Sequence, residues 1–118
     1  MAPQTNSQKM AQTAYKRIVA RQPTKEYKSF ALEFPSLVHS CGLAQAVAFA
    51  SGEKAHRKNY LEDLRAVLAA IGHAEAGSVP DFAQATRESL VPSYVRLSRN
   101  ALVAAGWLKR YVEALAPA

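Results

Sequence analysis

The stretch TKEYKSFALEFPSLVHSCGLAQAVAFASG, residues 24–52, decides the fold of this chain. Up to Cys41 its apolar side chains recur every three or four residues, which is the spacing of one face of an α-helix. Thr24 is suited to cap this helix, and Gly42 is suited to end it in a left-handed conformation. Residues 43–50 are apolar nearly all round, which predicts a second, short and buried helix. The apolar face of the first helix consists of Tyr27, Phe30, Ala31, Phe34, Leu37, Val38 and Cys41.

Pro35 lies inside the first of these two helices. Proline has no N–H to donate, and its ring clashes with the carbonyl group four residues earlier, here that of Ala31. We therefore expect either a kink at Pro35 or two shorter helices in place of one.

The segment before this stretch predicts another amphipathic helix. Residues 1–6 are expected to form a flexible arm, and either Asn6 or Ser7 can cap a helix that runs to about Arg21. Pro23 then ends the segment. The expected apolar face of this helix consists of Met10, Ala11, Ala14, Tyr15, Ile18 and Val19.

The segment after the stretch predicts three more helices. Apolar residues at helical spacing run through residues 55–71, a shorter helix capped by Ser78 or Asp81 follows, and a long helix covers residues 93–115 after Pro92. No segment shows the apolar–polar alternation of a strand. The sequence therefore predicts an all-α fold in which residues 1–118 form one domain, a single compact bundle of five to six helices.

The net charge of +6 is concentrated at the two ends of the chain. Residues 1–28 carry +5 and residues 82–118 carry +3, whereas residues 29–81 carry −2. A polyanionic partner such as nucleic acid would explain this asymmetry. Basic charge can also serve solubility alone, so the pattern leaves both interpretations open.

Helical wheels place most of these bases away from the expected core. In the last helix, arginines separated by small residues lie opposite the apolar face, and in the first helix the bases lie opposite or beside it. Clustered Lys and Arg side chains contact phosphates without reading base sequence. The candidates for binding nucleic acid or an acidic partner are Lys9, Lys16, Arg17, Arg21, Arg96, Arg99 and Arg110.

Trp107 lies at the edge of the basic face of the last helix. Its indole can stack on a base, anchor a protein interface or be buried against a neighbouring helix. Trp107 and Lys109 are therefore candidates for a partner interface.

The sequence lacks the residue patterns that mark a catalytic or metal site. His39, His56 and His73 are far apart, and none pairs with another His or with Cys at metal-ligand spacing. Cys41 belongs to an apolar stripe, where a cysteine is usually a small core residue. The sequence contains no glycine-rich phosphate loop, no GxSxG and no HExxH motif. We predict a protein that is not an enzyme and that needs neither a metal nor a cofactor.

Charged residues in the middle of the chain have an ordinary explanation. Lys58, Glu62 and Arg65 share one row of a helix and predict a solvated ladder of ion pairs. Glu62 and Asp63 point about 100° apart, so they do not form a facing acid pair.

The expected location is the cytoplasm. Cys41 is the only cysteine, which excludes a disulfide framework and fits a reducing compartment. The N-terminal segment MAPQTNSQKM lacks the apolar run of a secretory signal. No window reaches the roughly 20 apolar residues of a membrane span.

Two segments follow a recognisable pattern. Residues 34–49, FPSLVHSCGLAQAVAF, are similar to an aliphatic–Pro pair, an apolar turn, Asn-Gly-Leu and an apolar helix ending in Phe. The second segment has Tyr94, Leu97, Ala101, Leu102, and residues 107–110 and 113–115. Both resemble the small α-helical subunit, the fifth subunit, of type III-B CRISPR (Cmr) effector complexes. Phe34 and Cys41 depart from the family pattern, which often has a smaller aliphatic residue and Asn there.

The resemblance implies a role in antiviral defence. It implies a bundle that stacks in a few copies along the backbone subunits and helps form the channel for CRISPR RNA and target RNA. It also implies a non-catalytic subunit, because target cutting belongs to the backbone subunit and nucleotide chemistry to the large subunit. The candidate bases would then bind RNA, and the partners would be the other Cmr subunits and further copies of this chain.

Two other classes of protein remain open. One is a stand-alone basic helical protein that binds nucleic acid, although the sequence lacks an obvious helix-turn-helix pair. The other is a small all-helical enzyme with an arginine-lined pocket, which would show convergent charges in a concave site.

Overall fold

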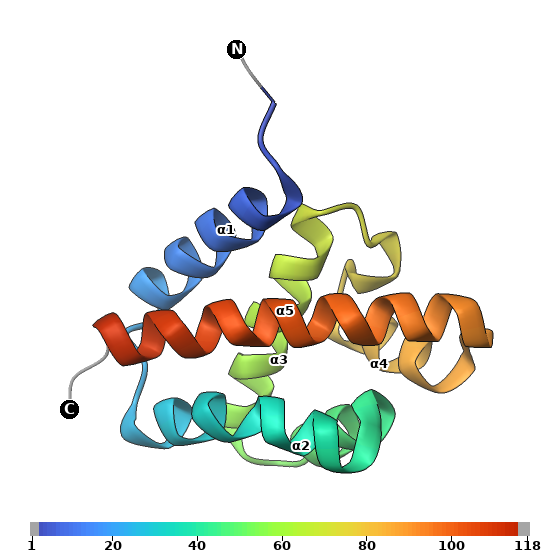
Figure 1. The fold of residues 1–118 in the computed structure, drawn as a ribbon. Helices are drawn as coiled ribbons and strands as arrows, with labels where there is room; N and C mark the ends of the chain where they lie inside the picture. Colours follow the sequence, from blue (N-terminus) through green and yellow to red (C-terminus); the bar gives the residue numbers. More distant parts are fainter. Residues whose placement is uncertain (1–2, 116–118) are drawn as a thin grey trace.

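The structure, a computed structural model, describes residues 3–115, which contain five α-helices and one turn of 3₁₀-helix (Figure 1). No strand occurs among these residues, so the prediction of an all-α fold with five to six helices is confirmed. The elements are α1 (Asn6–Arg21), α2 (Lys25–Ala50), α3 (Ala55–Ala70), η1 (Ala74–Ala76), α4 (Val79–Glu88) and α5 (Val91–Leu115).

The long helix α5 organises the bundle. It packs against α1, α2 and α3, and α3 also packs against α1 and α2. Figure 1 shows α1 and α2 on opposite sides of α5, with α3 crossing behind it. The short helix α4 contacts α2, α3 and η1. All five helices therefore share one core, to which α4 contributes the completely buried Phe82.

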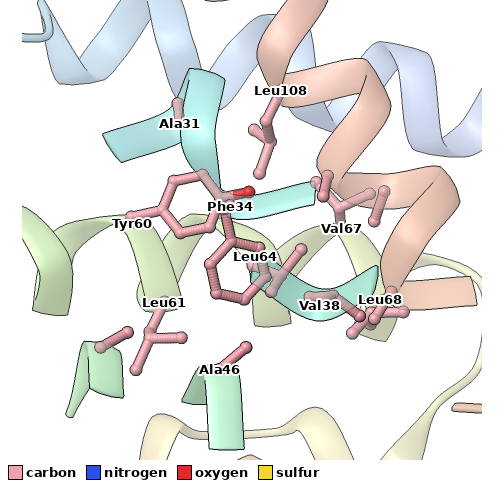
Figure 2. Packing of buried hydrophobic residues seen from close by; sticks show 14 of the residues in the cluster. Ala31, Phe34, Val38, Ala46, Tyr60, Leu61, Leu64, Val67, Leu68 and Leu108 are labelled. Atoms are coloured by element: carbon pink, nitrogen blue, oxygen red, sulfur yellow. The ribbon is translucent and has the colours of Figure 1, made fainter. Parts of the chain in front are cut away.

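The centre of the core is aromatic. Phe34 of α2 and Tyr60 of α3 are completely buried, and their ring centroids lie 4.9 Å apart (Figure 2). The ring of Phe30 meets Tyr60 edge-on at 5.4 Å. Leu64 of α3 and Leu108 of α5 fill the space around these rings. Buried aromatic pairs of this kind contribute about 1 kcal/mol each beyond their burial, so they help to fix how α2 and α3 pack.

Side chains cap α2 and α4 at predicted positions, but the cap of α1 lies earlier in the chain than predicted. The hydroxyl of Thr24 accepts a hydrogen bond from the Tyr27 amide, and that of Ser78 accepts one from the Asp81 amide. For α1 the prediction of Asn6 or Ser7 was wrong, because Thr5 is the cap. Its hydroxyl accepts from the amide of Gln8, whose side chain accepts from the Thr5 amide in return. The reciprocal pair satisfies two donors at once, and Asn6 is already helical.

The break in α2 lies at Gly42 and not at Pro35. Gly42 has φ of +84°, the left-handed region that glycine enters without a Cβ clash, whereas α2 continues through Pro35 in helical conformation. The positive φ expected at Gly42 is confirmed, but its ψ of 162° is extended and is not that of a left-handed helix stop. The division into two shorter helices occurs at Gly42 and not at Pro35. Beyond the break, the amide of Ala44 donates to the Tyr94 hydroxyl of α5 at 3.0 Å, which satisfies a helix-start donor.

Two side chains predicted for the core of α1 lie at the surface. Met10, Ala14 and Ile18 are buried as expected, but Tyr15 is 47% exposed and Val19 is 50% exposed. The apolar face of α1 is wider than the contact with its neighbours, so its edge remains uncovered. In α5 the helix starts at Val91, earlier than expected, because proline is tolerated in a first helical turn.

Candidate nucleic-acid and partner interface

The arginines predicted for the outer face of α5 are at the surface. Arg96, Arg99 and Arg110 are all exposed, and none makes an ion pair or hydrogen bond within residues 3–115. The opposite face of the helix is buried and contains Leu97, Ala101, Ala104, Ala105, Leu108 and Val112. The three guanidinium groups therefore keep their full donor capacity for an external anion. We call this set the basic face of α5.

The basic face extends along most of the helix. Arg96 and Arg110 are 14 positions apart, which corresponds to about 21 Å at a rise of 1.5 Å per residue. Arg96 lines a hollow beside the α3–α4 linker, and Arg99 lines a groove against α2. These positions suit contacts to separate phosphates of a strand rather than to a single small anion.

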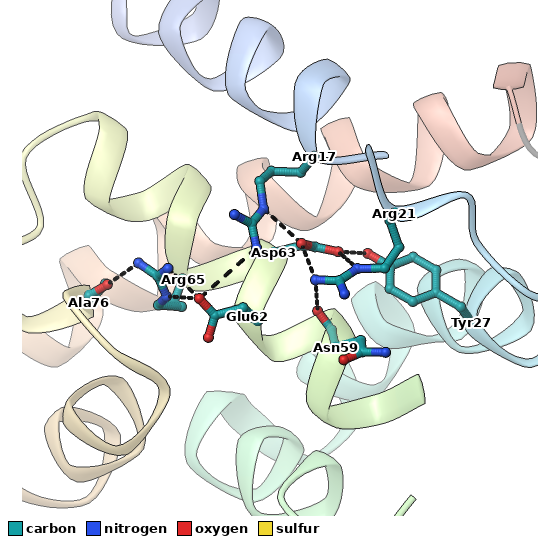
Figure 3. A network of polar contacts seen from close by, with 8 residues as sticks. All are labelled: Arg17, Arg21, Tyr27, Asn59, Glu62, Asp63, Arg65 and Ala76. Carbon is teal, nitrogen blue, oxygen red and sulfur yellow. Dashed lines mark hydrogen bonds and ion pairs between the residues drawn. The ribbon is translucent and has the colours of Figure 1, made fainter. Parts of the chain in front are cut away.

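The four predicted bases of α1 divide into two pairs. Lys9 and Lys16 are exposed and have no partner within residues 3–115. Arg17 and Arg21 instead bind Asp63 of α3 (Figure 3). The sequence did not indicate this pairing, because 42 or more positions separate the partners.

The carboxylate of Asp63 is completely buried and receives several donors. Nε of Arg17 lies 2.8 Å from Oδ1, and Arg21 binds both oxygens, with Nη2–Oδ1 at 2.9 Å and Nε–Oδ2 at 3.0 Å. The hydroxyl of Tyr27 donates to Oδ2 at 2.5 Å. A buried carboxylate needs such donors to offset its lost hydration. The cluster joins α1, α2 and α3, and we call it the Asp63 cluster.

Contacts within the Asp63 cluster and burial raise the pKa values of Arg21 and Tyr27. The hydrogen bond to Asp63 raises the pKa of Arg21 above its ordinary value. Burial raises the pKa of Tyr27 far above its ordinary value, and the Asp63 charge and hydrogen bond raise it further. Arg21 therefore stays charged and Tyr27 stays protonated over the whole physiological range.

The charged row of α3, formed by Lys58, Glu62 and Arg65, forms only part of the predicted ladder of ion pairs. Arg65 donates to the Glu62 carboxylate and also reaches the carbonyl of Ala76 at 3.4 Å. Lys58 is exposed and has no partner within residues 3–115. Arg65 therefore ties α3 to η1, and Lys58 is a separate surface charge.

Trp107 belongs to an aromatic row between α5 and α1. Its ring stacks on Tyr111 at 6.0 Å, and Tyr111 meets the edge of Tyr15 at 5.5 Å. Trp107 is half-buried and packs against the core. Lys109 is two positions further on, which turns it to the other side of the helix. The two candidates for a partner interface therefore do not form one surface.

Two exposed apolar features were not predicted. Leu90, directly before α5, is 79% exposed, and Val91, the first residue of α5, is 74% exposed. Phe49 at the end of α2 is exposed on one side and carries the Arg57 guanidinium 4.1 Å from its ring centroid. A helical wheel identifies neither feature, because the first lies where α5 begins and the second depends on how α3 packs.

Histidine and cysteine side chains are dispersed in the structure. Cys41 is half-buried and its thiol donates to the carbonyl of Leu37 at 3.0 Å. Within residues 3–115 no group of three or more His, Cys, Asp and Glu side chains is placed to hold a metal ion. Among the described helices, none combines the length and hydropathy needed to cross a membrane.

Fold and surface together define a small, basic, all-helical protein with an unpaired cationic face. The family model described as "CRISPR-associated protein (Cas_Cmr5)" matches residues 6–115, so the chain belongs to this family. It is similar to the CRISPR system Cmr subunit Cmr5 of Thermus thermophilus, with 40% identity covering 94% of this chain and 96% of the relative.

A solved structure has the same fold. The crystal structure of a CRISPR-associated Cmr5 family protein from Thermus thermophilus is similar with a TM-score of 0.83 and 38% identity. The match covers 96% of this chain and 98% of that one. The resemblance seen in the sequence is therefore confirmed at the level of the family.

Proposed function

We propose that this chain is a non-catalytic, cytoplasmic subunit of a Cmr CRISPR effector complex. In this role it stacks along the backbone subunits and places the basic face of α5 in the channel that holds CRISPR RNA and target RNA. Family membership and the name of the Thermus relative support a place in such a complex. The observation that carries the RNA contact is that the side chains of Arg96, Arg99 and Arg110 have no partner within residues 3–115.

The structure favours a narrower set of RNA contacts than the charge pattern alone. Arg17 and Arg21 are bound to a buried carboxylate, so releasing them to a phosphate would leave the buried Asp63 without a counter-charge and with only the Tyr27 hydroxyl as a donor. We therefore assign these two arginines to stability. The proposed RNA contacts are Lys9, Lys16, Arg96, Arg99 and Arg110.

Protein contacts in the complex require an apolar surface as well. Leu90 and Val91 form an exposed apolar pair whose burial against another subunit would remove apolar surface from water. The double substitution Leu90→Ser and Val91→Ser should therefore reduce incorporation into the reconstituted complex while leaving the circular dichroism spectrum unchanged. Full incorporation would remove this pair from the proposed interface.

The RNA contact is tested by reversing the charge of the basic face. The triple variant Arg96→Glu, Arg99→Glu and Arg110→Glu, reconstituted with the other subunits, should bind target RNA more weakly. Phosphate contacts do not read sequence, so the loss should be similar for different targets. Each lost contact should also reduce the slope of log affinity against log salt by about one unit.

A matched variant separates this face from net charge. The substitutions Lys54→Glu, Lys58→Glu and Arg87→Glu change the charge by the same amount at exposed positions elsewhere. This control should retain target binding. Equal effects of the two triple variants, or wild-type binding and assembly by the first, would contradict the proposed role. Tight binding of duplex DNA by the isolated chain would favour a stand-alone nucleic-acid-binding protein instead.

A further inference from the structure

A polar hollow of about 480 Å³ lies where the start of α1, the α3–α4 linker and α5 meet. Asn6 comes from α1, Gly72, His73 and Glu75 from the linker, and Arg96 and Asn100 from α5. We call this hollow the His73 pocket. Only Arg96 of these residues belongs to the proposed channel face, so the pocket is a distinct feature of the surface.

The floor of the pocket is held by hydrogen bonds to the imidazole of His73, which is only 8% exposed. Nδ1 lies 3.1 Å from Oε1 of Glu75, and Nε2 lies 2.8 Å from Nδ2 of Asn100. A carboxylate only accepts, so Nδ1 carries the proton. In the neutral imidazole Nε2 is then the acceptor, and Asn100 donates to it.

This arrangement determines which groups remain for a ligand. The Asn100 amide gives one of its two N–H donors to His73, and its Oδ1 remains as an acceptor, as does the second oxygen of Glu75. Arg96 is exposed and has no partner among the described residues, so it adds an available cation to the pocket. Gly72, at φ +96°, has no side chain, and a Cβ there would meet nothing within 4 Å. A flat ring can therefore approach the peptide plane.

We propose that the His73 pocket binds a single unpaired guanine nucleotide of RNA. Guanine carries two adjacent N–H donors, N1–H and the 2-amino group, which match acceptors at Glu75 and Asn100. The guanidinium of Arg96 matches the phosphate of the same nucleotide. The pocket volume is sufficient for one nucleotide. Adenine and cytosine present a single amino group beside an acceptor, which would face the Glu75 carboxylate unfavourably.

The inference rests on the proposed RNA-containing assembly for its biological ligand, but its chemistry is testable on the isolated full-length chain. Calorimetric titration should compare guanosine 5′-monophosphate (GMP) with inosine 5′-monophosphate, which lacks the 2-amino group, and with adenosine 5′-monophosphate. Losing a hydrogen bond to a charged group costs about tenfold in affinity. GMP should therefore bind about tenfold more tightly than either analogue. Equal binding of the three, or GMP binding no better than inorganic phosphate, would overturn the inference.

Three variants assign the contacts. Glu75→Gln keeps an acceptor for His73 but removes the carboxylate, and it should weaken GMP binding about tenfold. Arg96→Ala should weaken GMP but leave guanosine, which has no phosphate, unaffected. Arg110→Ala removes the same charge from the same helix outside the pocket and should change neither. If Arg110→Ala weakens GMP binding as much as Arg96→Ala does, the general positive charge of the helix accounts for binding and the proposed pocket is contradicted.

The result is separable from the test of the proposed function. Failure of GMP to bind, together with lost target binding by the α5 triple variant in the complex, would remove the pocket and leave the channel role. Binding by an acidic peptide in place of GMP would also overturn the inference, because the pocket would then serve a protein partner.

Discussion

Arg21 at the end of α1 binds both oxygens of the buried Asp63 carboxylate on α3, with nitrogen–oxygen distances of 2.9 and 3.0 Å. This two-point geometry fixes the guanidinium plane as well as its distance. Arg17 and Tyr27 complete the cluster, so the α1–α2 turn is anchored to α3 by polar contacts next to an aromatic core. Two of the bases that the charge pattern assigned to a partner thus serve the fold.

Removing the negative charge of Asp63 should strongly destabilise the protein. In Asp63→Asn, Arg17 and Arg21 lose their counter-charge and a buried amide replaces the shared acceptor, at an expected cost of about 3 kcal/mol in the free energy of unfolding. Urea unfolding followed by circular dichroism measures it. Glu62→Gln, next to it but half-exposed, should cost less than about 1 kcal/mol. Similar losses of unfolding free energy in the two variants would contradict a larger contribution from the buried carboxylate.

The two buried tyrosines should respond oppositely to loss of their hydroxyl groups. Tyr27→Phe removes a donor to a buried charge and should cost about 2 kcal/mol. The Tyr60 hydroxyl is buried without a partner within residues 3–115, so Tyr60→Phe should be neutral or stabilising. Chemical denaturation of both variants decides the matter, and a large loss in Tyr60→Phe would show that its hydroxyl has a partner in solution.

Stability should fall at alkaline pH because of the same two tyrosines. Burial raises the pKa of Tyr27 and of Tyr60 above the ordinary value, and the nearby Asp63 charge adds to both shifts. Below about pH 10 both states hold these protons, so the contribution is fully present. Above it the unfolded chain releases protons that the folded chain keeps, and the free energy of unfolding declines. The double variant Tyr27→Phe and Tyr60→Phe should lose this part of the decline, whereas Tyr15→Phe, at an exposed position, should keep it.

Two glycine-to-alanine substitutions should change the stability of the protein in opposite directions. Gly42 has φ of +84° and ψ of 162°, a region essentially restricted to glycine that costs other residues about 1–3 kcal/mol, so Gly42→Ala should destabilise. Gly106 lies inside α5, and a Cβ there meets no atom within 4 Å, so Gly106→Ala should stabilise by about 0.5–1 kcal/mol. Thermal unfolding of both variants checks the signs. A neutral Gly42→Ala would show that α2 can straighten at the break.

Local chemistry accounts for the features that the sequence predicted well. Thr24 and Ser78 cap helices with their own side chains, and Gly42 adopts a backbone conformation open to few other residues. These properties involve only a few neighbouring residues. Pro35 did not locate the break in α2, because a proline removes one hydrogen bond but its fixed φ is still helical, and the helix leaves helical conformation only at Gly42.

By itself the sequence determined which side of each helix is apolar, where most helices begin and end, and that the basic residues gather at the two ends of the chain. Helical periodicity sets these properties within one element. Only the tertiary structure decided which bases are paired. Arg21 and Arg96 both lie off the main apolar stripe, yet one meets Asp63 and the other meets solvent, because a neighbouring helix covers one and not the other. The His73 pocket likewise exists only where α1, the linker and α5 converge, since no local pattern encodes contacts between residues so far apart in the chain.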